Sequence, residues 1–197
     1  MAGAQRVIRR GALWNPFNTN RNVESFYLLL LAHFIGDFPL QTPWVYRWKV
    51  RYIWGLFLHA LLHVLVAMLL VQYGGHYWRL WLILGVSHFT IDWYKLRLTF
   101  RRAWVGFLLD QGVHIVMLGL LARMYPHLPS VLPFSQVHFL LGYALLPALL
   151  MFGWVYASGR EHTGMGVWHW MRNTFVRYSQ ISGYVLVLAV LFLLYRM

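Results

Sequence analysis

The sequence predicts an all-α protein, a polytopic bundle of about six helical segments embedded in a membrane. Of the 197 residues, 60% are hydrophobic and only 11% are charged, and the mean hydropathy is +0.53. Such values are typical of integral membrane proteins rather than soluble domains. The apolar residues gather in runs of about 20, long enough for a helix to cross a bilayer. Because lipid offers the backbone no hydrogen-bond partners, we expect each run to be helical.

Six apolar runs mark the expected helices. They lie at residues 25–42, 52–73, 78–98, 104–124, 136–157 and 178–195. The first is the least regular, because Gly36, Pro39 and Pro43 interrupt it, and proline removes a backbone donor and disfavours helix before it. Two interpretations of this segment stay open: a full span with a broken end, and a re-entrant helix buried in protein.

The chain divides into three regions. Residues 1–24 carry four arginines without an apolar core, which indicates a basic arm at the membrane surface rather than a signal peptide. Residues 25–125 form the expected four-helix core, and residues 126–197 add two membrane helices joined by a glycine-rich loop. The formal net charge of +12 lies in short connections between apolar runs. This distribution favours contact with membrane lipids and argues against nucleic acid as a partner.

Basic residues predict the orientation of the chain. The connections after the first, third and fifth segments are rich in arginine and lysine, whereas the intervening connections carry only Arg79 and Arg123. The positive-inside rule places the rich connections in the cytoplasm. The orientation of the N-terminus stays open, since it depends on whether the first segment crosses the membrane.

Histidines and aspartates recur at a spacing of four residues along the first four segments. All three aspartates of the chain take part, and a His–His pair repeats the spacing. The pairs are His33 and Asp37, His59 and His63, His88 and Asp92, and Asp110 and His114. Four residues is about one helical turn, so each pair projects from one face of its helix. Because consecutive segments are antiparallel, all four pairs fall at similar depth, toward the basic connections.

Such a cluster predicts a metal site. Imidazole and carboxylate suit Zn, Mn or Fe where thiolates are absent, and the chain has no cysteine. The eight residues suffice for two ions, or for one ion with a surrounding layer of orienting groups. Two neighbouring ions would activate a water and stabilise the leaving oxygen in hydrolysis of a phosphoester. The expected function is therefore metal-dependent hydrolysis of a lipid-linked or amphiphilic substrate. Lys95 and Gln111 lie at similar depth and are the candidate catalytic groups, with Lys95 contacting the anion.

Two other classes of function stay open. The His/Asp pairs would serve as a structural polar network in an accessory subunit of a larger membrane complex, with Asp92 and Lys95 as an (i, i+3) ion pair. Intramembrane histidine and aspartate also form relays, as in a proton or metal-ion carrier.

Four ordered motifs resemble a known family. Residues 31–41 (LAHFIGDFPLQ), His59-x-x-x-His63, residues 87–95 (SHFTIDWYK) and residues 109–114 (LDQGVH) resemble the bacterial membrane proteins grouped as domain of unknown function 3307. The resemblance covers roughly residues 25–125. It implies a multi-pass protein of the bacterial cytoplasmic membrane and no particular reaction. A looser similarity, resting on residue types, points to membrane-bound metal-dependent hydrolases.

Overall fold

The computed structural model describes residues 19–158 and 166–196, and these form helices and their connections, with no strand among them. The elements in order are α1 (Thr19–Asp37), α2 (Pro43–Arg51), α3 (Ile53–Leu70), the 3-10 turn η1 (Gly74–Tyr77), α4 (Trp78–Lys95), α5 (Ala103–Met124), α6 (Phe134–Ser158) and α7 (Gly166–Tyr195). The predicted all-α class is therefore confirmed. Most of the basic arm and of the glycine-rich loop lies outside the described residues.

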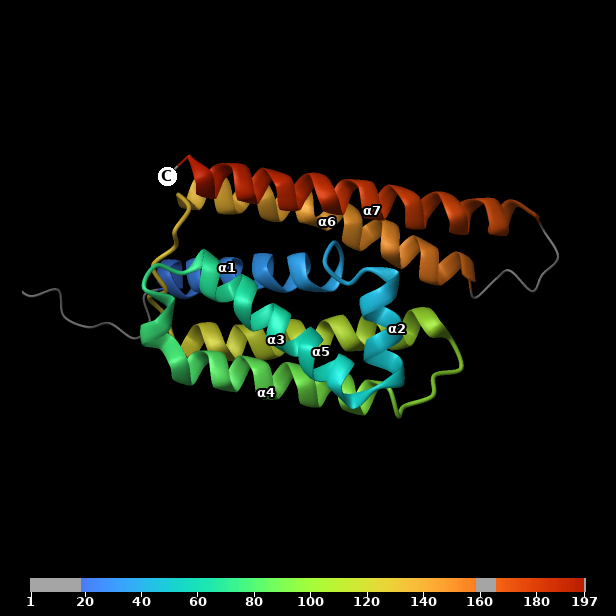
Figure 1. Cartoon of the computed structure of the whole chain (residues 1–197), viewed down its shortest axis with the longest axis horizontal. Helices are drawn as coiled ribbons and strands as arrows, with labels where there is room; N and C mark the ends of the chain where they lie inside the picture. Colours follow the sequence, from blue (N-terminus) through green and yellow to red (C-terminus); the bar gives the residue numbers. More distant parts are fainter. Residues whose placement is uncertain (1–18, 159–165, 197) are drawn as a thin grey trace, which may run out of the picture.

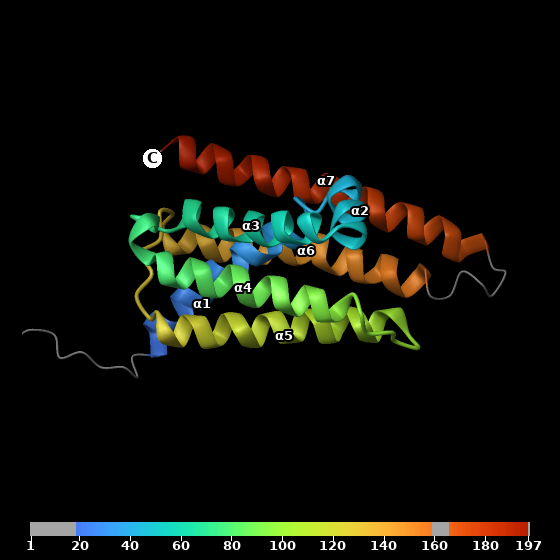
Figure 2. The ribbon, with the colours of Figure 1, turned by 60° about the horizontal axis from the view of Figure 1, so that its bottom comes forward.

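Four of the described helices are long and apolar enough to cross a membrane: α3, α5, α6 and the part of α7 from Asn173 to Tyr195. The six long helices run roughly along one axis (Figures 1 and 2). The chain is thus a helical membrane protein, built as a bundle in which short connections reverse the direction of each helix.

The first expected segment is two elements instead of one. Helix α1 ends at Asp37, two residues before Pro39, and α2 begins at Pro43. Proline suits the first turn of a helix because its missing N–H would have no intrahelical partner there. The Thr42 side chain caps this turn by accepting a hydrogen bond from the Val45 backbone N–H at 3.4 Å. Figure 1 shows α2 lying across the bundle axis, between the ends of α1 and α3.

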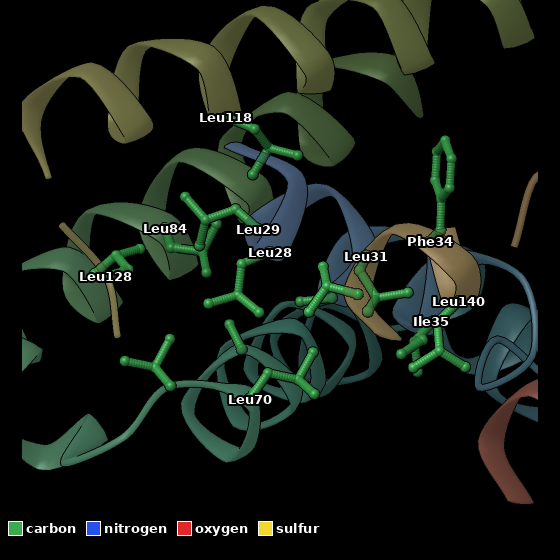
Figure 3. Packing of buried hydrophobic residues seen from close by; sticks show 14 of the residues in the cluster. Leu28, Leu29, Leu31, Phe34, Ile35, Leu70, Leu84, Leu118, Leu128 and Leu140 are labelled. Carbon is green, nitrogen blue, oxygen red and sulfur yellow. The ribbon is translucent and has the colours of Figure 1, made fainter. Parts of the chain in front are cut away.

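Helix α1 lies at the centre of the bundle and packs against α3, α5 and α6. Leu28, Leu29 and Leu31 are almost fully buried although they point in different directions around the helix. Figure 3 shows these leucines among side chains of the neighbouring helices, including Leu70, Leu84 and Leu118. A helix that is buried all round needs apolar residues on every face. Any polar group on α1 must therefore find its partner inside the protein.

Candidate metal centre

The structure brings the four His/Asp pairs together between α1, α3, α4 and α5. Each helix contributes one pair, and in each pair the two residues lie one turn apart on the inward face. The pairs lie late in α1 and α4 and early in α3 and α5. All eight side chains therefore lie at the end of the bundle nearest α2 and the α4–α5 connection. Their side chains are between 0 and 8% exposed. The centre is therefore a buried polar cluster inside an apolar bundle.

Asp37 contacts three histidines and Gln111. Its Oδ1 atom lies 3.2 Å from His59 Nε2 and 3.2 Å from His63 Nε2. Its Oδ2 atom accepts a hydrogen bond of 3.0 Å from the Gln111 amide and lies 3.5 Å from His33 Nε2. One carboxylate at the end of α1 thus contacts groups from α3 and α5.

Asp92 and Asp110 each pair with a lysine. The Lys49 ammonium lies 2.8 Å from Asp92 Oδ2, an oxygen that is also 3.3 Å from His88 Nε2. Lys95 donates a hydrogen bond to Asp110 Oδ2. The Asp92–Lys95 ion pair that the spacing suggests is therefore a wrong prediction. Lys95 reaches across to Asp110 on α5, and the partner of Asp92 is Lys49 on α2.

Lys49 is a contributor that sequence reasoning missed. In the sequence it follows the first apolar run among basic residues, where its charge indicates only the orientation of the chain. In the structure it is 5% exposed and also donates to the Gln41 side chain at 3.1 Å. Buried lysines are almost always paired, but no local signal marks this one, because its apolar neighbours Trp48 and Val50 are themselves exposed.

Two histidine rings donate hydrogen bonds to backbone carbonyls, and these bonds indicate which ring nitrogen carries the proton. The Nδ1 atom of His63 lies 2.9 Å from the carbonyl oxygen of His59, and His114 Nδ1 lies 2.9 Å from the carbonyl oxygen of Asp110. A carbonyl can only accept, so in each ring Nδ1 carries the proton. The Nε2 atom of a neutral ring is then a bare lone pair. For His114, Nε2 is buried with no hydrogen-bond partner among the described residues.

This assignment makes the contact between His63 and Asp37 a contact between two acceptors. At 3.2 Å, a lone pair and a carboxylate repel unless a cation, either a proton or a metal ion, lies between them. Donor atoms bound at about 2.0–2.2 Å to one tetrahedral ion lie roughly 3.3–3.6 Å apart. The observed separations of 3.2 Å from Asp37 Oδ1 to both His59 and His63 are close to that range. The residues therefore fit a metal ion.

Two sets of donor atoms are close enough to hold an ion. In the first, Asp37, His59, His63 and His88 each offer an atom within 4.8 Å of the others; in the second, His88, Asp92 and His114 do so. His88 belongs to both sets, and its ring stacks on His63 with centroids 3.8 Å apart. His33 joins through its ring, 5.0 Å from that of His114. All eight residues expected from the sequence thus lie in one cluster.

The remaining predicted groups lie at the edge of the cluster. Gln111 bridges it by donating to Asp37 and, at 3.3 Å, to Asp110, and its side-chain oxygen lies 3.3 Å from His33 Nε2. The Lys95 side chain is 35% exposed, so this lysine connects the buried carboxylates with the outside of the bundle. His76 lies outside the cluster: it is exposed on η1, and its Nδ1 atom lies 3.2 Å from the Tyr73 carbonyl oxygen.

The geometry defines a class: a helical membrane protein with a buried His/Asp cluster that could bind metal. Residues 25–141 match the family described as "Protein of unknown function (DUF3307)", and the chain belongs to it. The matched region contains the whole cluster and extends past the expected limit near residue 125 into the start of α6. Neither a curated protein nor a solved structure gives a significant match.

Proposed function

We propose that this protein is a metal-dependent hydrolase of the bacterial cytoplasmic membrane, acting on a lipid-linked or amphiphilic substrate. The observation that carries the proposal is the buried donor set of Asp37, His59, His63 and His88, whose ligand atoms all lie within 4.8 Å of one another. The His59 backbone carbonyl accepts a hydrogen bond from His63 Nδ1 and leaves His63 Nε2 facing Asp37, an arrangement typical of metal-bound histidine. Zn, Mn or Fe would suit this donor set.

The charges of the cluster favour one ion over two. Three carboxylates face two ammonium groups, from Lys49 and Lys95. With neutral histidines this leaves one excess negative charge, and one divalent ion would change it to one excess positive charge. Asp37, His59, His63 and His88 would hold that ion. Lys49 already neutralises Asp92 at the second set, where a further cation would be repelled.

The exposed side of the cluster supports a hydrolytic role. A bound ion would lower the pKa of a water and stabilise charge on a phosphoryl oxygen. Lys95 would bind the anionic group of the substrate, and Gln111 would orient it by hydrogen bonding. The water oxygen would bond to phosphorus as the ester P–O bond breaks. One water proton would finish on the leaving alcohol, and Asp110, which accepts a hydrogen bond from Lys95, would carry it.

A structural role in a larger complex is the second candidate, and a specific observation favours it. The Lys49–Asp92 and Lys95–Asp110 pairs and the Gln111 bridge already join α1, α2, α4 and α5 through polar contacts. Such a network would hold the helices together without an ion.

Metal analysis separates these candidates. Protein purified without chelator is expected to contain about one equivalent of metal, and His63→Ala or Asp37→Ala should lower the content roughly tenfold or more. His76→Ala, at an exposed histidine outside the cluster, is the matched control and should leave it unchanged. Absence of metal from a folded wild-type protein would contradict the proposal and favour the structural network.

The reaction needs its own assay. Metal-loaded protein in mixed micelles with phosphatidic acid should release inorganic phosphate, and Lys95→Gln should raise KM more than it lowers kcat because it removes the anion contact. If bound metal is found but no phosphoester of this kind is cleaved, the metal site stands and the hydrolase assignment fails.

A further inference from the structure

A second candidate site lies on the outer face of the bundle, away from the metal centre. It is an apolar groove of about 670 Å³ between α3 and α4, two packed helices that lie next to each other in Figure 2. The floor of the groove is buried and consists of Ala60, Val64 and Trp81. Its rim is formed by exposed apolar side chains of α3 and α4, among them Phe57, Leu82 and Val86.

Glycine accounts for the depth of this groove. Gly85 lines it at the point where α4 approaches α3, and a Cβ atom added there would lie 3.2 Å from Val64 Cγ2. The missing side chain lets the two helices come close, while the exposed residues Leu82 and Val86 on α4 form a wall of the groove. The result is a trough along the helices, not a hole leading into the core.

The groove lies on the lipid-facing side of a helix that is long and apolar enough to cross a membrane, α3. Along α4 its lining runs from Trp78 to Phe89, which is about 16 Å at the rise of an α-helix. Its lining is almost wholly apolar. A straight hydrocarbon chain matches this length and chemistry, whereas a peptide would bring unpaired backbone groups into lipid.

One end of the groove carries a positive charge. The Arg79 guanidinium lies over the ring of Trp78, with its carbon 5.2 Å from the ring centroid, and Trp78 is part of the groove lining. Arg79 is exposed at the start of α4, beside the 3-10 turn. An arginine stacked on tryptophan at the end of an apolar trough matches a lipid whose headgroup bears a phosphate with net negative charge.

We propose that the α3–α4 groove is a specific binding site for one anionic phospholipid, with an acyl chain in the groove and the headgroup phosphate at Arg79. The site is separate from the metal centre, because none of its lining residues belongs to the His/Asp cluster. The lipid extends the contact between α3 and α4 and fills a surface that protein side chains leave open.

The other end of α4 provides a matched control for the charge. Arg97, two residues after α4 ends, lies over Trp93 with its carbon 3.3 Å from the ring centroid, so it repeats the arginine–tryptophan stack there. Trp93 is not part of the groove lining. Removing each guanidinium in turn therefore tests whether the headgroup lies at the end that this structure assigns.

Native mass spectrometry tests the site. Purified full-length protein is exposed to equal amounts of dioleoyl phosphatidylglycerol and dioleoyl phosphatidylcholine in detergent. The wild type should retain one phosphatidylglycerol in preference to phosphatidylcholine. Arg79→Gln should remove the preference, and Arg97→Gln should keep it. Equal retention of the two lipids by the wild type, or loss of the preference in Arg97→Gln alone, would overturn the proposal.

Filling the groove tests the acyl chain. Val86→Trp places a large side chain on the exposed rim and should reduce retention of phosphatidylglycerol at least roughly tenfold. Val116→Trp makes the same change at an exposed position of α5 outside the groove and should have no effect. Leu82→Trp is a second, separate block in case Val86→Trp does not fold. Retention at the wild-type level in either folded rim variant would overturn the proposal.

Discussion

Gly36 makes room for the His63 ring. It precedes Asp37 on α1, and a Cβ atom built there would lie 2.4 Å from His63 Nε2. No real contact of that length exists, so any larger residue must push the imidazole away from Asp37. The proposed ligand geometry therefore depends on a residue that has no chemistry of its own. A spacing pattern of histidines and aspartates does not reveal this dependence.

Gly36→Ala is expected to weaken metal binding by about 10- to 100-fold, the range seen when a group that orients a ligand is lost. The ring would move while every ligand stays present. Competition with a metallochromic chelator measures the affinity. Gly112→Ala on α5 is the control, because a Cβ atom there meets nothing within 4 Å. That variant should bind metal normally and be slightly more stable, since alanine is the better helix former. Equal affinities in the two variants would contradict the role given to Gly36.

Helix α2 completes the centre by folding back on α3. The close approach occurs at Gly55, where an added Cβ atom would lie 2.3 Å from the carbonyl carbon and oxygen of Trp48. This backbone contact directs Lys49 inward to Asp92, while Trp44 and Tyr46 on the same short helix stay about half exposed. An interfacial position suits such a helix, with aromatic and basic residues toward the headgroups and one lysine toward the core.

Gly55→Ala should detach α2 and expose Lys49. Forcing a methyl group into a backbone contact costs ~1–3 kcal/mol, so cleavage after Lys49 by a lysine-specific protease should rise roughly tenfold or more. The assay is simple to interpret, because Lys49 and Lys95 are the two lysines of the chain and cleavage after Lys95 serves as an internal reference. Gly119→Ala, where a Cβ atom meets nothing within 4 Å, should match the wild type. Unchanged protection of Lys49 in Gly55→Ala would show that α2 is held by other contacts.

The bundle as a whole combines apolar outer helices with polar inner faces. Helix α4 contains Arg79, Asp92 and Lys95, and it is not among the four helices that are apolar enough to cross a membrane by composition alone. Inside the bundle, however, Asp92 is neutralised by Lys49, and Lys95 pairs with Asp110. Because these charges are satisfied within the protein, their cost in lipid is reduced. We therefore expect α4 to cross with its neighbours.

Single cysteines at the two ends of α4 test this topology. The natural chain has no cysteine, so His76→Cys and Arg101→Cys each place one thiol at an exposed position. In intact cells a membrane-impermeant maleimide should label His76→Cys, whereas Arg101→Cys should be labelled only after permeabilisation, since it lies in a basic connection. Labelling of both from the same side would mean that α4 does not cross.

Composition and spacing by themselves determined the class of fold and the residues of the cluster. Apolar runs of a bilayer's width must be helices, and a repeat of four residues puts two side chains on one helix face whatever surrounds it. The break in the first segment is also visible in the sequence, because proline removes a backbone donor and disfavours helix at the residue before it.

The tertiary structure alone decided which groups meet. Lys49 pairs with Asp92 although 43 positions separate them, and Lys95 crosses to Asp110 instead of bonding within its own helix. The space at Gly36 and the contact at Gly55 likewise belong to two helices at once. Such pairings depend on how each helix is rotated and how closely it packs. The helical repeat fixes the face on which a residue lies, and only the packing of the faces selects its partner.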